Sequence, residues 1–100
     1  MPTPESVLER YFIKQCALRG IWQNKFTSAI TGVPDRIVIY NGTTAFVELK
    51  AKNGVLSERQ KRVIAQIKSH GGTVFVPYSK QDVDDIVSQL TEKEGEKRGI

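Results

Sequence analysis

The sequence of 100 residues is poor in the residues that build disulfides and zinc sites, because it has one cysteine, Cys16, and one histidine, His70. A single cysteine cannot form an internal disulfide, which favours a reducing, cytoplasmic compartment. One cysteine and one histidine are also too few for a structural zinc site. The sequence has no apolar run of about 18 residues, and its first residues lack the pattern of a secretion signal. We therefore expect a cytoplasmic protein with no membrane span.

Positive charge is in modest excess, but it is concentrated in one region. The net charge is +4 and the pI is about 9.4. Between residues 50 and 68 the only acid is Glu58, whereas the basic residues there are Lys50, Lys52, Arg59, Lys61, Arg62 and Lys68. This concentration fits a polyanionic partner, although a solvated helix face has the same composition.

The apolar pattern predicts one α/β domain over residues 1–90, with a mixed sheet flanked by helices in the order αβββαβα. Thr3 is a candidate N-cap with Pro4 at the first helical position, and Gly20 is a candidate stop for that helix. Residues 91–100 are charged and nearly free of apolar side chains. We expect them to form a disordered tail.

A β-hairpin is the strongest local prediction. The dipeptide Asn41-Gly42 separates two β-branched, apolar runs, residues 36–40 and 43–50, and this dipeptide favours a two-residue hairpin turn. The other elements expected are an extended piece over 21–27, a helix over 57–70, a strand over 73–77 and a helix from Ser79.

The hairpin predicts a cluster of charged groups. If Asn41-Gly42 is the two-residue turn, Asp35 faces Glu48, with Cβ atoms about 5 Å apart. Lys50 follows Glu48 by two residues and so points to the same face. Two opposed carboxylates need a cation, and Mg²⁺ is a natural candidate. Alternatively, the three residues are solvated strand ends joined by a salt bridge, and a bulge would shift the register.

These residues resemble a known family. Pro34-Asp35, followed thirteen residues later by Glu48-Leu49-Lys50, resembles the motif of the PD-(D/E)XK nuclease superfamily. The longer pattern is similar to stand-alone phage and bacterial members of the VRR-NUC family, and it comprises Gly32-Val33-Pro34-Asp35-Arg36-Ile37, Val47-Glu48-Leu49-Lys50, and Leu56-Ser57 with Gln60. The resemblance extends from about Glu5 to Leu90, and it implies the αβββαβ core of that superfamily.

The resemblance implies a Mg²⁺- or Mn²⁺-dependent endodeoxyribonuclease. Asp35 and Glu48 would bind the metal together with the backbone carbonyl of Leu49. Lys50 would position or activate the attacking water and stabilise charge on the phosphate. An acid on the first helix would complete the metal shell. Glu5 and Glu9 both fit that role, and we favour Glu9.

The resemblance also makes Gln60 an active-site residue, although Ser57-x-x-Gln60 is a capping box as well. We expect the basic residues Lys52, Arg59, Lys61 and Arg62 to contact DNA phosphates. A homodimer acting on branched or Holliday-junction DNA is expected, because one site cuts one strand. The alternatives are a catalytically silent nucleic-acid-binding module and a scaffold protein. Metal titration combined with a cleavage assay would separate the three.

Overall fold

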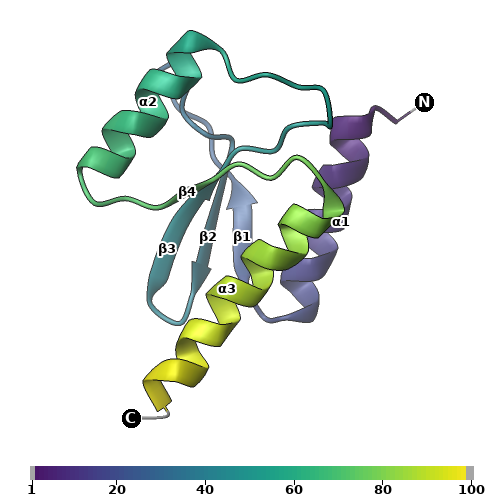
Figure 1. The fold of residues 1–100 in the computed structure, drawn as a ribbon, viewed down its shortest axis with the longest axis vertical. Helices are drawn as coiled ribbons and strands as arrows, with labels where there is room; N and C mark the ends of the chain where they lie inside the picture. The colour runs from purple at the N-terminus through teal and green to yellow at the C-terminus, as the bar shows by residue number, and fades with distance from the viewer. Residues whose placement is uncertain (1, 99–100) are drawn as a thin grey trace.

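The computed structural model describes residues 2–98, with side chains up to residue 92, and it has the mixed α/β fold that the sequence predicts. The elements are α1 (Pro4–Leu18), β1 (Trp22–Lys25), β2 (Arg36–Tyr40), β3 (Thr43–Val47), α2 (Glu58–Ser69), β4 (Val74–Phe75) and α3 (Lys80–Arg98) (Figure 1). Their order is the predicted αβββαβα.

The hairpin between β2 and β3 has the predicted register without a bulge. Asn41 and Gly42 have φ values of 48° and 86°, and two consecutive positive φ values are typical of a type I′ turn. Tyr40 then pairs with Thr43, and the ladder continues without interruption to the pair of Arg36 and Val47. A register shift would have moved each side chain to the other face.

The sheet has the strand order β1-β2-β3-β4, in which β4 alone runs parallel to its neighbour β3. The backbone ladder between them extends past the end of β3. The N–H groups of Glu48 and Lys50 donate to the carbonyls of Phe75 and Pro77 at 2.9 and 3.0 Å. The extended segments 43–50 and 73–77 are therefore held side by side, as their sequences predicted.

The three helices begin where the sequence placed their caps. The side-chain oxygens of Thr3, Ser57 and Ser79 each accept a hydrogen bond from the backbone N–H three residues later, at 3.0–3.1 Å. At the C-terminal end, α3 extends to Arg98, and the disordered tail expected over residues 91–100 stays a prediction. Thr91, the first residue of the expected disordered tail, is half-buried and accepts a hydrogen bond from Arg19 Nη1 at 3.2 Å. Residues 99–100 of that tail lie outside the described residues.

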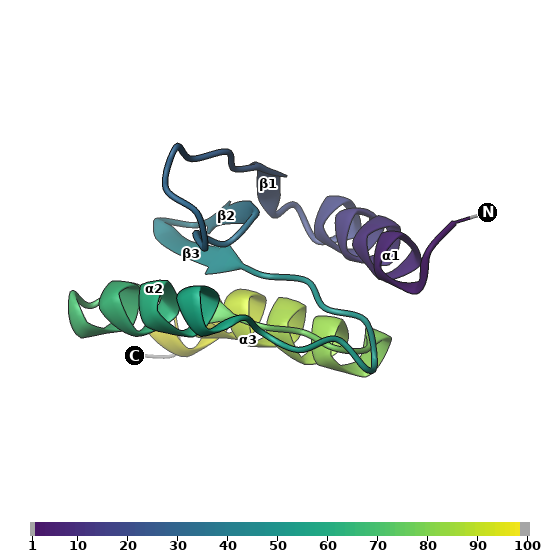
Figure 2. The same ribbon diagram turned by 90° about the horizontal axis from the view of Figure 1, so that it is seen from above.

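The hydrophobic core lies between one face of the sheet and the helices α1 and α3. Its buried residues are Leu8, Phe12, Cys16, Ile21, Val38, Ala45, Val47, Leu49, Val83, Ile86, Val87 and Leu90. Figures 1 and 2 place α1 on one side of the sheet and α2 on the other. The other face of the sheet is therefore covered by α2 and by the loop before β2. Among residues 2–98, no helix is long and apolar enough to cross a membrane.

Candidate active site

Two carboxylates face each other at the end of the hairpin opposite its turn. Because Arg36 pairs with Val47, the next position along the ladder brings Asp35 opposite Glu48, as predicted. Glu48 is only 6% exposed. Burial, together with the hydrogen bond and negative charge of Asp35, raises the pKa of Glu48 to about 8, although the ammonium of Lys50 opposes this shift. A doubly ionised pair at this position is therefore unfavourable without a further cation.

Lys50 supplies one cation on the same face of the hairpin. Residues two apart in a strand point the same way, and Lys50 Nζ lies 3.7 Å from Glu48 Oε2. The Lys50 side chain is 15% exposed. Partial burial strengthens such an ion pair and fixes the direction of the ammonium. The structure thus brings together the three residues on which the sequence prediction centred.

Gln60 forms the predicted capping box and also contacts Glu48. Its Oε1 accepts a hydrogen bond from the Ser57 N–H at 2.9 Å, and its own N–H donates to Ser57 Oγ at 3.0 Å, which completes the capping box. Its Nε2 donates to Glu48 Oε2 at 3.2 Å. Because the cap fixes the Gln60 side chain, the first turn of α2 also orients the Glu48 carboxylate.

The backbone carbonyl of Leu49 is directed toward Pro34. The N–H groups of Glu48 and Lys50 donate to the carbonyls of Phe75 and Pro77. Backbone groups alternate in direction along a strand, so the N–H and carbonyl groups of Leu49 face the opposite way, toward the residues just before β2. The register places Pro34 opposite Leu49. Proline has no N–H, so the ladder supplies no donor to this carbonyl at Pro34.

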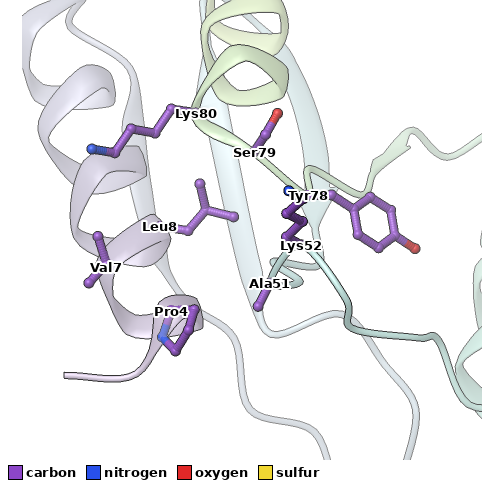
Figure 3. Close-up of a pocket in the computed structure, with 8 residues that line it drawn as sticks. All are labelled: Pro4, Val7, Leu8, Ala51, Lys52, Tyr78, Ser79 and Lys80. Carbon is purple, nitrogen blue, oxygen red and sulfur yellow. The ribbon is translucent and has the colours of Figure 1, made fainter. Parts of the chain in front are cut away.

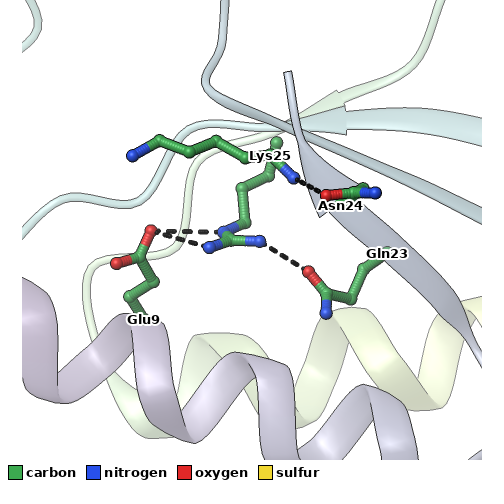
Figure 4. A network of polar contacts seen from close by, with 5 residues as sticks. Glu9, Gln23, Asn24 and Lys25 are labelled. Carbon is green, nitrogen blue, oxygen red and sulfur yellow. Dashed lines mark hydrogen bonds and ion pairs between the residues drawn. The ribbon is translucent and has the colours of Figure 1, made fainter. Parts of the chain in front are cut away.

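Glu9, the acid that we favoured for the metal shell, points elsewhere. Its Oε2 accepts hydrogen bonds from Arg36 Nε at 3.2 Å and Nη2 at 3.1 Å, while Arg36 Nη1 donates to Gln23 Oε1 at 2.6 Å (Figure 4). Arg36 is 8% exposed and points to the core face, so its guanidinium requires such partners. Glu5, one turn earlier, lines the pocket of the carboxylate pair. The structure therefore brings Glu5 to this pocket in place of Glu9.

The carboxylate pair lies in a pocket of about 500 Å³, which we call the carboxylate pocket. Its walls come from the first turn of α1, the loop before β2, the end of the β3 segment and the start of α2. The residues that line it are Glu5, Thr31, Gly32, Val33, Asp35, Glu48, Lys50, Val55, Ser57 and Gln60. Sequence reasoning did not assign a role to Thr31 or Val55, because neither belongs to a motif with a chemical requirement.

The donor set of the carboxylate pocket fits a hard divalent cation that retains several waters. Asp35 and Glu48 offer carboxylate oxygens to this pocket. Among residues 2–92, whose side chains the structure describes, no group of three or more His, Cys, Asp or Glu side chains is placed to hold a metal. Mg²⁺ is commonly bound through one or two carboxylates and several waters, whereas a structural zinc site needs four protein ligands. The residues present therefore suit Mg²⁺ or Mn²⁺ and do not suit zinc.

The four basic residues expected to contact DNA are distributed around the carboxylate pocket. Arg59 and Arg62 line a neighbouring pocket of about 240 Å³, which shares Thr31 with it. Lys61 forms an exposed ion pair of 3.4 Å with an acid of its own helix. Lys52 lines a third cavity, near the start of α3. Of these four residues, Arg59 and Arg62 are thus the ones whose pocket adjoins that of the carboxylates.

Gly32 allows the loop before β2 to pack against α2. Its φ is +95°, and a Cβ atom there would lie 2.8 Å from Arg59 Cγ and 3.1 Å from the Arg59 carbonyl oxygen. Both the backbone conformation and the close contact require glycine. The sequence pattern contained this glycine, but its contact with Arg59 depends on a packing that no local pattern specifies.

Replacing Glu9 by glutamine is expected to lower the free energy of unfolding by about 1–3 kcal/mol, because the buried Arg36 loses its anionic partner. Urea denaturation measures this change. Glu5→Gln is the matched control, since Glu5 is an exposed acid on the same helix and should change stability by less than about 0.5 kcal/mol. Equal stability of the Glu9→Gln variant and the wild type would contradict a structural role for Glu9.

Comparisons with known proteins agree with this fold. A family model described as the VRR-NUC domain matches residues 5–81. A solved structure titled "VRR_NUC domain" superposes with a TM-score of 0.81 at 28% sequence identity, and the match covers 87% of this chain and 97% of that one. No curated protein matches the sequence. The matched segment contains all the residues that line the carboxylate pocket.

Proposed function

The chain belongs to the VRR-NUC family and is therefore a nuclease-type domain, and from this premise we propose that it is a Mg²⁺- or Mn²⁺-dependent DNA endonuclease. The observation that carries the proposal is the convergence of Asp35, Glu48 and Lys50 at one end of the hairpin. The ion pair of 3.7 Å between Lys50 and Glu48 and the hydrogen bond from Gln60 fix this arrangement. A group held in place before the reaction contributes most to stabilising charge that develops during it.

In the proposed reaction each side chain has a separate task. Asp35 and Glu48, with the Leu49 carbonyl, would hold the divalent ion. Once bound, that ion would supply a water of lowered pKa and neutralise charge on the scissile phosphate. Lys50 directs its ammonium to the same face, where it would donate to the phosphate or orient the water. Gln60 maintains the orientation of Glu48 throughout.

Cleavage assays on a panel of linear, flapped and four-way DNA test this proposal directly. We expect cutting in Mg²⁺ or Mn²⁺ and none in EDTA, with the greatest rate on branched DNA. DNA binding without cutting in either metal would favour the alternative of a catalytically silent module. Equal cutting of linear and four-way DNA would remove the branched preference and leave the nuclease proposal intact.

We also propose that the protein acts as a homodimer, because paired cuts in a two-fold symmetric junction are most simply made by a two-fold symmetric enzyme. The exposed side chains of Trp22 and Ile39, paired across β1 and β2, offer an apolar surface for such a contact. Sedimentation at micromolar concentration would show a species of twice 11.2 kDa. A species of 11.2 kDa alone, with or without DNA, would contradict the dimer. A cytoplasmic location remains a prediction.

Replacing Lys61 and Arg62 together by alanine is expected to weaken binding to every DNA shape. Each contact to a phosphate releases counterions. The loss of two contacts should therefore reduce the slope of log K against log [salt] by about two. Fluorescence anisotropy over a salt series measures this slope. Arg10 and Lys14, an exposed basic pair on α1, provide the matched control. An equal loss in the control would mean that only net charge matters.

A further inference from the structure

The pocket of about 240 Å³ between α2 and the loop before β2 adjoins the carboxylate pocket. We call it the arginine pocket, and the residues that line it are Ile30, Thr31, Arg59, Arg62, Val63 and Gln66. Thr31 lines both pockets. Gly32, which lines the carboxylate pocket, packs against Arg59, because a Cβ atom at Gly32 would lie 2.8 Å from Arg59 Cγ. The two pockets are therefore direct neighbours.

The two arginines of this pocket offer positive charge to a ligand. Arg59 and Arg62 are three residues apart on α2, so their side chains lie on one face of the helix. Both side chains are exposed. Three ion pairs form among the side chains that the structure describes, and neither arginine takes part in one. Two guanidinium groups without an acidic partner, side by side at one pocket, favour an anionic ligand.

The third cavity, which lies beside α1, offers less positive charge (Figure 3). Its surface is mostly apolar. Lys80, one of its two lysines, is directed toward α1, where its Nζ lies 5.3 Å from the centre of the Tyr11 ring. That ammonium is already engaged in a cation–π contact. Compared with this cavity, the arginine pocket is the better site for an anion.

We propose that the arginine pocket binds one particular phosphate of the DNA strand that is cut, the one next to the scissile phosphate, a proposal that rests on the function proposed above. Successive phosphates of a duplex strand are one nucleotide apart, a rise of about 3.4 Å. A strand with its scissile phosphate in the carboxylate pocket therefore has a neighbouring phosphate close to the arginine pocket.

The chemistry of the arginine pocket fits a phosphodiester. A guanidinium donates two parallel hydrogen bonds to phosphate oxygens, and Arg59 and Arg62 supply two such groups. The Thr31 hydroxyl, at the boundary of the two pockets, can donate a further hydrogen bond. Ile30 and Val63 offer aliphatic surface to the sugar between the two phosphates.

The segments that form the arginine pocket are held in place. The Phe26 N–H donates to the Asp35 carbonyl at 2.7 Å and closes the base of the loop that carries Thr31. The capping box fixes the first turn of α2, and the loop packs against that turn where Gly32 contacts Arg59. A phosphate bound by fixed groups places its neighbour at a fixed position relative to the carboxylates. The arginine pocket would therefore set the register of the strand as well as its affinity.

The test uses the DNA that the wild type cuts fastest, with one phosphate of the cut strand at a time replaced by a neutral methylphosphonate. Cleavage in Mn²⁺ gives kcat/KM for each substrate. We expect a neutral linkage on one side of the scissile phosphate to lower kcat/KM of the wild type about ten-fold, the usual effect of losing a hydrogen bond between charged groups. In the double variant Arg59→Gln/Arg62→Gln the same linkage should lower kcat/KM less than about two-fold, because its partners are already absent.

Two further variants make the outcome decisive. Arg62→Gln alone keeps the packing of Arg59 against Gly32, which guards against misfolding, and it should also reduce the effect of the neutral linkage. Lys68→Gln is the matched control, since it removes an exposed positive charge from the same helix outside the pocket, and it should retain the ten-fold effect. An effect of equal size in the wild type and both arginine variants, or one spread evenly over many linkages, would overturn the proposal.

The same substrates, measured by anisotropy in EDTA, separate this inference from the proposed nuclease function. If no DNA is cut in Mn²⁺ or Mg²⁺, but one neutral linkage weakens binding of the wild type and not of the arginine variants, the phosphate site stands while the nuclease proposal fails. If no linkage couples to Arg59 and Arg62 in either assay, this inference is wrong whether or not DNA is cut.

Discussion

Replacing Lys50 by alanine is expected to lower the rate of DNA cleavage by about 10²–10³-fold, the usual cost of removing one positioned group that stabilises charge in a transition state. Metal and DNA binding should be retained, because Asp35, Glu48 and the basic residues of α2 remain. The ammonium lies 3.7 Å from Glu48 Oε2 in a half-buried position, so no solvent cation takes its place with the same geometry. Single-turnover cleavage gives the rate, and calorimetry and anisotropy give the two affinities.

The control for this variant is Lys14→Ala, which removes an exposed lysine of α1 outside the described pockets. It should cut at the wild-type rate. A Lys50→Ala variant that also cuts at the wild-type rate would reduce Lys50 to an ion-pair partner of Glu48. Loss of Mn²⁺ binding in the same variant would show that the ammonium is needed to keep the carboxylates in place.

Replacing Asp35 by asparagine is expected to lower Mn²⁺ affinity by more than about ten-fold, because even residues that merely support metal ligands typically contribute 10–100-fold. Asparagine keeps the shape and the position opposite Glu48 but removes the negative charge. Isothermal calorimetry measures the affinity. Asp85→Asn, at an exposed acid of α3, is the control and should bind Mn²⁺ as the wild type does. Unchanged binding in Asp35→Asn would exclude Asp35 as a ligand.

The same substitution should stabilise the metal-free fold, and the pH dependence of the free energy of unfolding gives the reason. Burial and the Asp35 carboxyl raise the pKa of Glu48 to about 8, so the unfolded chain releases this proton at lower pH than the folded chain does. The stability that the protonated Glu48 provides is present at pH 4 and is lost as the pH rises toward 8, with a slope of at most about 1.4 kcal/mol per pH unit.

Asp35→Asn removes the negative charge that helps to raise the pKa of Glu48, so stability should fall less steeply with pH. The gain in stability over the wild type should therefore be greatest near pH 8. Thermal melting in EDTA at a series of pH values measures the effect. A wild-type melting temperature that does not fall between pH 5 and pH 8 would contradict the unfavourable carboxylate pair.

The central part of the site was predictable because its geometry follows from one local signal. Asn41-Gly42 specifies a turn that needs two positive φ values, and the turn alone determines which residues of the two strands oppose each other. The pairing of Asp35 with Glu48 follows from that register, and the position of Lys50 follows from strand alternation. The capping box at Ser57 is equally local, so the start of α2 was predictable too.

The rest of the site and its surroundings depend on contacts between elements that are distant in the sequence, and no local pattern specifies such contacts. Glu5 and Glu9 are one helical turn apart, and the choice between them depends on how α1 rotates against the sheet. That rotation places Glu9 against the buried Arg36, whose burial was not predictable from a strand-end position. The third cavity, which Lys52 lines, likewise requires α1 and α3 to meet. The hydrogen bond from Arg19 at the end of α1 to Thr91 of α3 is another such contact.

The proposed nuclease function is tested most directly by incubating the wild-type protein with a closed circular plasmid that contains an extruded cruciform. We expect Mn²⁺ to produce a linear plasmid cut at the cruciform and EDTA to prevent the cut. The Glu48→Gln variant, purified in parallel to exclude a contaminating nuclease, should leave the circle closed. A plasmid that stays closed with the wild type in both Mn²⁺ and Mg²⁺, or one that is cut equally by the Glu48→Gln variant, would contradict the proposed function.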